Sequence, residues 1–160
     1  MIDSTDLEIL SDLQTNARTS NAVIARRLGM APSAIHQRVR KLEERGVIAG
    51  YAARVDPEMV GRGVLAFVRL TADAALGDEE LPRHMAALPG VLEVHDVAGD
   101  DGYLLKVRVR DTADLHRLLH RGLGGLPGVR DTRTTIVLKT YAERVELPLP
   151  NPESTDRRQP

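Results

Sequence analysis

The tetrapeptide Leu-Pro-Gly-Val occurs twice in this chain, at residues 88–91 and again at residues 126–129. Each copy follows a stretch in which leucines recur at helical spacing. Each copy also precedes a stretch in which apolar and polar residues alternate, as in a half-buried strand. A strand-helix-strand unit that is used twice gives the order βαββαβ, the ferredoxin-like arrangement. The repeat therefore predicts an α+β domain, and the patterns around it place that domain at residues 64–146.

The alternating stretches give approximate bounds for the elements of this domain. Strands are predicted at 64–70, 91–97, 103–109 and 129–138, and a helix is predicted at 78–88. A second helix is expected to begin after Asp111, because aspartate is a good N-cap and Asp114 stands at the third helical position.

The first 53 residues follow a helical period instead. Helices are predicted at 5–15, 20–28 and 32–45, with the tight turn Gly29-Met30-Ala31 before the third. In the second helix, Val23, Ile24 and Leu28 are expected to face the core. Three short helices with such a turn are typical of a helix-turn-helix, and residues 47–53 are predicted as a short strand or wing. The sequence therefore predicts an N-terminal winged helix-turn-helix domain at residues 1–53.

Two further segments are predicted to lie outside the domains. Asp56-Pro57 and Gly61-Arg62-Gly63 are turn-forming sequences, so residues 54–63 are expected to form a linker. The last residues, 147–160, contain four prolines among polar and charged residues, and this composition predicts a disordered tail.

The basic charge of the chain is concentrated in one segment. The whole chain has a net charge of −1, but residues 18–54 contain eight basic and only two acidic side chains. A local excess of cations is the electrostatic footprint of a nucleic-acid-binding surface. The scarcity of aromatic residues, with one Phe, three Tyr and no Trp, argues against a surface that stacks single-stranded bases.

The third predicted helix has two distinct faces. Ile35, Val39 and Leu42 recur at helical spacing and are expected to pack on the first two helices. The opposite face presents Ser33, His36, Gln37, Arg40 and Lys41, with Arg38 at one flank. Short and amide side chains near the start of a helix reach base edges in the major groove, and cations further along meet phosphates. The alternative is an ordinary solvated helix face, which the local charge and the tight turn disfavour.

Several segments in a fixed order carry a family resemblance: Asp6-Leu7-Glu8-Ile9-Leu10, Ser20-Asn21, Ala25-Arg26-Arg27-Leu28-Gly29, Arg38-Val39-Arg40-Lys41-Leu42-Glu43, residues 46–51, residues 99–109 and residues 126–134. With these segments the chain resembles the leucine-responsive regulatory protein and asparagine regulator (Lrp/AsnC) family, also called feast–famine regulators. The resemblance extends to about residue 146. It implies a sequence-specific transcriptional regulator of double-stranded DNA, homodimers that assemble into an octamer, and an amino acid or related small molecule as effector.

The helix pattern and the resemblance together define the candidate sites. The candidate DNA-binding residues are Asn21, Pro32, Ser33, His36, Gln37, Arg38, Arg40 and Lys41. The candidate effector-binding residues are Gly99, Asp100, Asp101, Gly102, Tyr103, Thr134, Thr135 and Ile136. A glycine-bearing turn offers backbone groups to a carboxylate or an ammonium, and threonine hydroxyls add hydrogen bonds. The same Asp-Asp-Gly sequence is also compatible with a plain hairpin turn.

The chain departs from the family pattern at three positions. Ala31 stands where the family usually has a serine cap, which costs the third helix roughly 1 kcal/mol of capping. Val23 stands where a capping-box glutamate is usual, and Gly102 stands where an aspartate is common. The last change removes a carboxylate from the implied effector site.

Other functions find less support in the sequence. No cysteine and no long apolar run are present, so a cytoplasmic protein without a membrane span is expected. No phosphate loop, nucleophile motif or dinucleotide fingerprint occurs, so we expect neither an enzyme nor a cofactor. His116 and His120 have the i, i+4 spacing of a metal site but no third ligand nearby, so no metal is expected. An architectural DNA-binding protein that needs no effector remains the alternative function.

Overall fold

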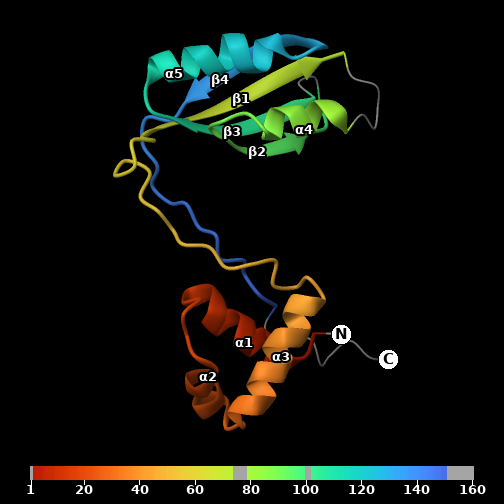
Figure 1. Ribbon diagram of the computed structural model, residues 1–160, viewed down its shortest axis with the longest axis vertical. Coiled ribbons are helices and arrows are strands. Elements are labelled where there is room, and N and C mark those ends of the chain that lie inside the picture. Colours follow the sequence, from red (N-terminus) through yellow and green to blue (C-terminus); the bar gives the residue numbers. More distant parts are fainter. Residues whose placement is uncertain (1, 74–78, 100–101, 151–160) are drawn as a thin grey trace. The chain divides into compact units, whose positions relative to one another are not determined.

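The computed structural model describes residues 2–73, 79–99 and 102–150. They form two compact units (Figure 1). The helical unit contains the residues up to Ala53 together with the described residues from Ala142 onward, and the sheet unit is Arg54–Tyr141. Each unit has its own buried apolar cluster.

The helical unit contains three short helices, α1 (Ser4–Thr15), α2 (Asn21–Leu28) and α3 (Pro32–Glu44). A reciprocal capping box starts α1, in which the side chains of Asp3 and Asp6 each accept a hydrogen bond from the backbone of the other. Gly29 ends α2 in the left-handed conformation at φ 65°, which a residue without a Cβ adopts readily. As predicted, Ala31 provides no side-chain cap for α3.

The core of the helical unit lies where the helical period predicts it, with one exception. Its buried side chains are Ile9, Leu10, Ile24, Ala25, Ile35, Val39 and Leu42. The prediction for Val23 is wrong, because this side chain is 54% exposed and Ala25 is buried instead. Val23 and Ala25 flank Ile24 on opposite sides of the α2 stripe, so apolar character alone did not show which of the two flanks faces the core.

The segment that follows α3 is held against that helix without forming a strand. The predicted strand at 47–53 is absent from the described structure, because the amides of Val47 and Ile48 donate to the carbonyl of Leu42, at 2.9 and 3.2 Å. Further on, the Tyr51 hydroxyl donates to Glu43 Oε1 at 2.9 Å. The pKa of Tyr51 is raised to about 12, mainly by burial and also by this hydrogen bond to the Glu43 carboxylate.

The sheet unit confirms the predicted βαββαβ order. It runs β1 (Val64–Ala72), α4 (Glu80–Ala86), β2 (Val91–Asp96), β3 (Tyr103–Val109), α5 (Thr112–Arg117) and β4 (Val129–Ile136). The strands are antiparallel in the order β2-β3-β1-β4, which is the ferredoxin-like sheet. Asp111 caps α5 through the amide of Asp114, as predicted. The helix then continues as a π-helical turn, Leu118–Gly122, and a short 3₁₀ turn, Leu123–Gly125.

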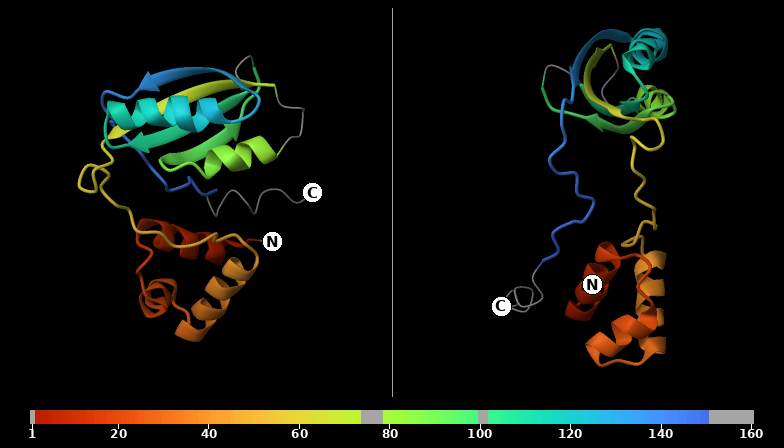
Figure 2. Two further views of the ribbon diagram at one scale, coloured as in Figure 1. Left: turned by 45° about the horizontal axis from the view of Figure 1, so that its top comes forward. Right: turned by 90° about the vertical axis from the view of Figure 1, so that its left-hand side faces the viewer.

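Both helices of this unit cover the same face of the sheet (Figure 2). The core between them and the sheet consists of alternate strand residues and the inward residues of the helices: Ala66, Val68, Leu70, Leu81, Met85, Tyr103, Leu105, Val107, Val109, Leu115, Leu118 and Leu123. The other side of the sheet, which we call the open face, carries Phe67 at the centre of β1 with 36% of its surface exposed.

The Leu-Pro-Gly-Val repeat has a physical basis in its glycines. Gly90 and Gly128 both adopt positive φ, at 94° and 85°, immediately before β2 and β4. A Cβ at Gly90 would also lie 2.8 Å from the carbonyl oxygen of Arg108, closer than atoms can approach. Each copy therefore turns the chain from a helix into an edge strand in a way that a side chain would obstruct.

The structure revises one part of the expected tail. Residues 147–150 lie against α1, whereas 151–160 fall outside the described residues. Composition alone predicts disorder for residues 147–150, but contacts with α1 hold them in place.

Among the described residues, none of the helices is long and apolar enough to cross a membrane.

Candidate DNA-binding face and effector site

The outward face of α3 carries the residues predicted to read DNA. Ser33, Gln37 and Lys41 are exposed and follow one another at i, i+4 and i+8, so they form one line along the helix. His36 and Arg40 form a second exposed line beside it, and Pro32 is exposed at the start of the helix. The order from short or amide side chains to cations is the one that a major-groove helix needs.

Asn21 connects this face to the start of α2. Its side-chain nitrogen lies 3.4 Å from Nδ1 of His36, a long contact between the two helices. Ser20 caps α2 just before it, with its hydroxyl accepting from the amide of Val23. The beginning of α2 and the reading face of α3 therefore belong to one continuous surface.

Arg38 makes a contact within the helical unit that the sequence did not predict. Its Nη1 donates to Asp3 at 2.6 Å and to Asp6 at 2.8 Å, so the guanidinium faces the capping box of α1. Hydrogen bonds to Asp3 and then Asp6 raise the pKa of Arg38. Burial acts to raise the pKa of Asp3, but the hydrogen bond from Arg38 and other favourable contacts outweigh it and lower that pKa. Arg38 therefore joins α1 to α3, and its contact with DNA stays a prediction.

Two other arginines of the basic segment also pair within the unit. Arg27 on α2 bridges Glu8 at 2.5 Å and Asp12 at 2.8 Å on α1. Arg40 on α3 pairs with Glu44 at 2.8 Å one turn later. That last pair is well exposed, and such pairs are worth little, so Arg40 can exchange Glu44 for a phosphate at small cost.

The predicted effector residues lie on two separated parts of the sheet. Gly102 and Tyr103 end the β2–β3 turn, where the Val97 amide donates to the Gly102 carbonyl at 2.9 Å. Tyr103 pairs with Leu70 of β1, whereas Thr134 pairs with Val68 of β1 from the opposite side. Strand β1 thus separates the two groups within one chain. Asp100 and Asp101 lie outside the described residues.

The last strand divides its own candidate residues between two faces. Thr134 is directly opposite Val68, which is buried on the helix-covered face, and Thr135 is opposite Phe67 on the open face. Directly opposed residues of an antiparallel pair share a face, so the two threonines point to opposite sides of the sheet. Ile136 follows Thr135 and is 44% exposed. One ligand cannot use both hydroxyls of the same chain.

Gly102 leaves room for the side chain that it lacks. It adopts φ 68°, and a Cβ there would lie 3.6 Å from the Leu70 carbonyl oxygen, which is ordinary contact. Gly99, at φ 134°, has no atom within 4 Å of such a Cβ. A Cβ at position 102 would thus fit without a clash, although the positive φ would strain any side chain there.

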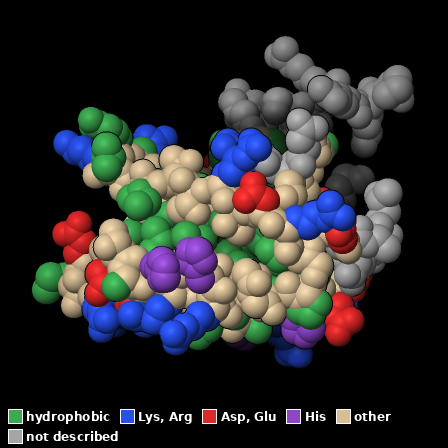
Figure 3. Space-filling view, turned by 90° about the horizontal axis from the view of Figure 1, so that it is seen from above, with side chains coloured by type: hydrophobic (Ala, Val, Ile, Leu, Met, Phe, Trp, Pro, Cys, Tyr) green, Lys and Arg blue, Asp and Glu red, His purple; other side chains and the backbone are tan. Residues whose placement is uncertain are grey.

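The histidine pair on α5 and the π-helical turn after it stays outside these sites. The ring centroids of His116 and His120 are 4.3 Å apart, and both side chains are exposed. Figure 3 shows a histidine pair side by side on the surface, bordered by Lys and Arg side chains. Across the described ranges, no group of three or more His, Cys, Asp or Glu residues is placed to hold a metal ion.

The two units match two known domain types. Residues 2–49 match a winged helix-turn-helix DNA-binding domain, and residues 64–147 match the Lrp/AsnC ligand-binding domain. The chain belongs to the Lrp/AsnC family. Members of this family are transcriptional regulators, and the chain's DNA-binding unit is the winged helix-turn-helix. The expectation of a regulator rather than an enzyme is thus confirmed by the relatives.

Individual Lrp/AsnC proteins are similar over most of the chain. The leucine-responsive regulatory protein of Haemophilus influenzae is 40% identical over 140 residues, which cover 86% of this chain and 84% of the relative. A transcriptional regulator of Neisseria meningitidis, solved with L-methionine, is 31% identical, with a TM-score of 0.85 over 92% of this chain and 97% of that one. The M. tuberculosis feast or famine regulatory protein complexed with L-methionine is 35% identical, with a TM-score of 0.84 over 92% and 99%.

Sequence reasoning missed two features of the DNA-binding unit. It did not find the partners of Arg38, because Asp3 and Asp6 are more than thirty positions away. It also missed that Gln14 and Leu149 bring the end of the described chain onto α1. A leucine flanked by two prolines was a weak signal of such an extended, packed segment.

Proposed function

We propose that this protein is a sequence-specific transcriptional regulator in the cytoplasm, and that it reads double-stranded DNA with α3. The observation that carries this proposal is the exposed line of Ser33, Gln37 and Lys41 beside the Asn21–His36 contact. Ser33 and Gln37 have the length and chemistry to contact base edges, whereas Lys41 is positioned for phosphate. Arg38, at one flank of this face, also holds α3 to α1 through Asp3 and Asp6.

The proposed effector is an amino acid or a close relative. Two similar proteins were solved with L-methionine, and this chain has the polar turn and threonine-bearing strand of the same domain type. The ligand would lie between subunits, because β1 separates the β2–β3 turn from Thr135 within one chain. The absence of a side chain at Gly102 favours a bulkier or acidic ligand over one that needs a carboxylate at this position.

The open face of the sheet is the proposed dimer contact. Phe67 is exposed at its centre, although large apolar side chains are usually buried. The polar part of this face includes Glu93, which lies 3.1 Å from both Lys106 and His95. A symmetric dimer would cover this face in both copies, and association of dimers into an octamer would follow the family resemblance.

Two measurements test the proposed function. Selection of binding sequences from random DNA should give a defined motif, and a thermal-shift screen with the twenty amino acids should find a ligand that raises the Tm. The same ligand should change the affinity for the selected DNA by the five- to 150-fold that allosteric coupling of about 1–3 kcal/mol gives. Weak sequence preference together with insensitivity to every amino acid would instead show an architectural DNA-binding protein.

A further inference from the structure

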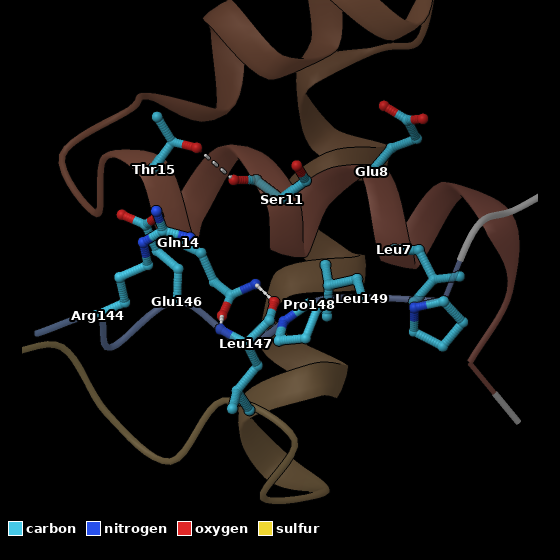
Figure 4. Close-up of a pocket in the computed structure, with 11 residues that line it drawn as sticks. Leu7, Glu8, Ser11, Gln14, Thr15, Arg144, Glu146, Leu147, Pro148 and Leu149 are labelled. Carbon is cyan, nitrogen blue, oxygen red and sulfur yellow. Dashed lines mark hydrogen bonds between the residues drawn. The ribbon is translucent and has the colours of Figure 1, made fainter. Parts of the chain in front are cut away.

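A segment from the far end of the chain lies along α1 in the helical unit (Figure 4). We call residues 144–150 the C-terminal strap. The side-chain amide of Gln14 binds the backbone of Leu147 twice: Nε2 donates to the Leu147 carbonyl at 3.1 Å, and the Leu147 amide donates to Oε1 at 2.7 Å. A side-chain amide used in this way reproduces the donor–acceptor pair of a β-bridge.

The strap has a second, apolar contact two residues later. Leu149 is half-buried and packs against the core cluster of the helical unit, whereas the side chain of Leu147 is 71% exposed. Pro148 and Pro150 flank Leu149, and a proline ring fixes φ and leaves no amide that needs a partner. The strap therefore loses little conformational entropy when it lies extended on the helix.

One stripe of α1 receives the strap. Leu7, Ser11 and Gln14 recur at i, i+4 and i+7, and together with the strap they line a groove of about 550 Å³. This stripe differs from the one that Ile9 and Leu10 turn into the core. The docking surface thus lies beside the core, where Leu149 meets the buried cluster.

We propose that this stripe of α1 is a docking surface for the chain's own C-terminal strap, and that docking links the DNA-binding unit to β4. Along the chain, α3 leads into β1 through residues 45–63, and β4 leads into the strap through residues 137–143. The helical unit is thereby connected to the strands by two segments of the chain, one after α3 and one before the strap. This regulatory role rests on the proposed function, because β4 carries Thr135 of the proposed effector site.

The test uses the full-length chain and three variants. Gln14→Ala removes both hydrogen bonds while replacing Gln with the better helix former, so a loss of stability cannot arise from helix propensity. Leu149→Ala removes the apolar contact. Leu147→Ala is the matched control, because it truncates the exposed leucine of the same segment and leaves its backbone bonds intact.

The measurements are hydrogen exchange at the Leu147 amide, the Tm of the helical unit and the ligand-induced change in DNA affinity. In the wild type this amide should exchange about two- to tenfold more slowly than in Gln14→Ala, the range expected for one hydrogen bond. Gln14→Ala and Leu149→Ala should lower the Tm by roughly 4–8 °C and reduce the response to the amino acid found in the thermal-shift screen. Leu147→Ala should behave as the wild type.

An unprotected Leu147 amide in the wild type would overturn the proposal, as would an undiminished ligand response in Gln14→Ala. Failure of the proposed function gives a different result. If the wild-type protein neither selects a DNA motif nor responds to any amino acid, the regulatory role falls with it, whereas the exchange rate of the Leu147 amide still decides whether the strap docks.

Discussion

The guanidinium of Arg38 lies 2.8 Å from the carboxylate of Asp6, which is itself buried at the start of α1. This contact joins the first helix of the DNA-binding unit to the helix that carries the reading face. A buried carboxylate that loses its cation is costly, because the charge stays out of water without compensation. The residue that holds this helix in place and those proposed to contact DNA are thus neighbours on the same helix.

Substitution of Arg38 should therefore lower the stability of the helical unit and leave base selection intact. We expect Arg38→Ala to lower the free energy of unfolding of the helical unit by about 1–3 kcal/mol, since Asp6 is left half-paired. Urea unfolding measures this loss. Lys41→Ala is the matched control on the same helix: it should leave stability unchanged and weaken binding to all DNA sequences alike. Equal stability of the two variants would contradict the assignment.

Gln37 should determine sequence preference. Gln37→Ala is expected to lose one bidentate base contact, worth about 1–3 kcal/mol, at one position of the binding site only. Competition binding against sites changed one base pair at a time would show this as a flattened preference at that position. If the variant discriminates as the wild type does at every position, Gln37 does not read a base.

The stability of the DNA-binding unit should depend on the charge of Asp3 in acid. The pKa of Asp3 is lowered in the folded state, so its contribution is present above its ordinary pKa of 3.8 and is lost as the pH falls through the lower folded value. Asp3→Asn keeps a capping oxygen but removes the charge. The Tm of the variant should be below that of the wild type at pH 6 and approach it near pH 3. A constant difference across this range would exclude the charge as the cause.

Thr134 and Thr135 should differ in their effect on the effector. If the ligand lies between subunits that meet at the open face, Thr135→Val removes a hydroxyl from the site, and Thr134→Val alters the other side of the sheet. Calorimetry should show an affinity about two- to tenfold weaker for Thr135→Val, the cost of one hydrogen bond. The opposite result would place the ligand on the helix-covered face.

The dimer should depend on Phe67. Phe67→Asp places a charge at the centre of the open face, and light scattering at micromolar concentration should then show a smaller assembly than the wild type. Met59→Asp is a suitable control, because Met59 is apolar and 83% exposed but precedes the sheet. A wild-type protein that is already monomeric would exclude the proposed contact.

The sequence by itself determined the order of helices and strands, the Asp111 cap of α5, and the two faces of α3. These features depend on residues within one turn or one strand pair, so the spacing of Ile35, Val39 and Leu42, or of Asp111 and Asp114, was sufficient to predict them. The prediction of a short strand after α3 is wrong, because amides of this segment donate to the carbonyl of Leu42 at the end of that helix.

Only the tertiary structure decided which of several equivalent residues is used. Arg38 and Arg40 are both basic residues of α3, yet Arg38 alone meets the capping box, because only its side of the helix faces α1. Thr134 and Thr135 point to opposite faces of the sheet because they are neighbours in a strand, but the packing of α4 and α5 decides which of the two faces is left uncovered. Leu149 is half-buried and Leu147 is exposed because Gln14 fixes the strap on α1. Contacts between residues far apart in the chain depend on how the elements pack, and no local pattern contains that information.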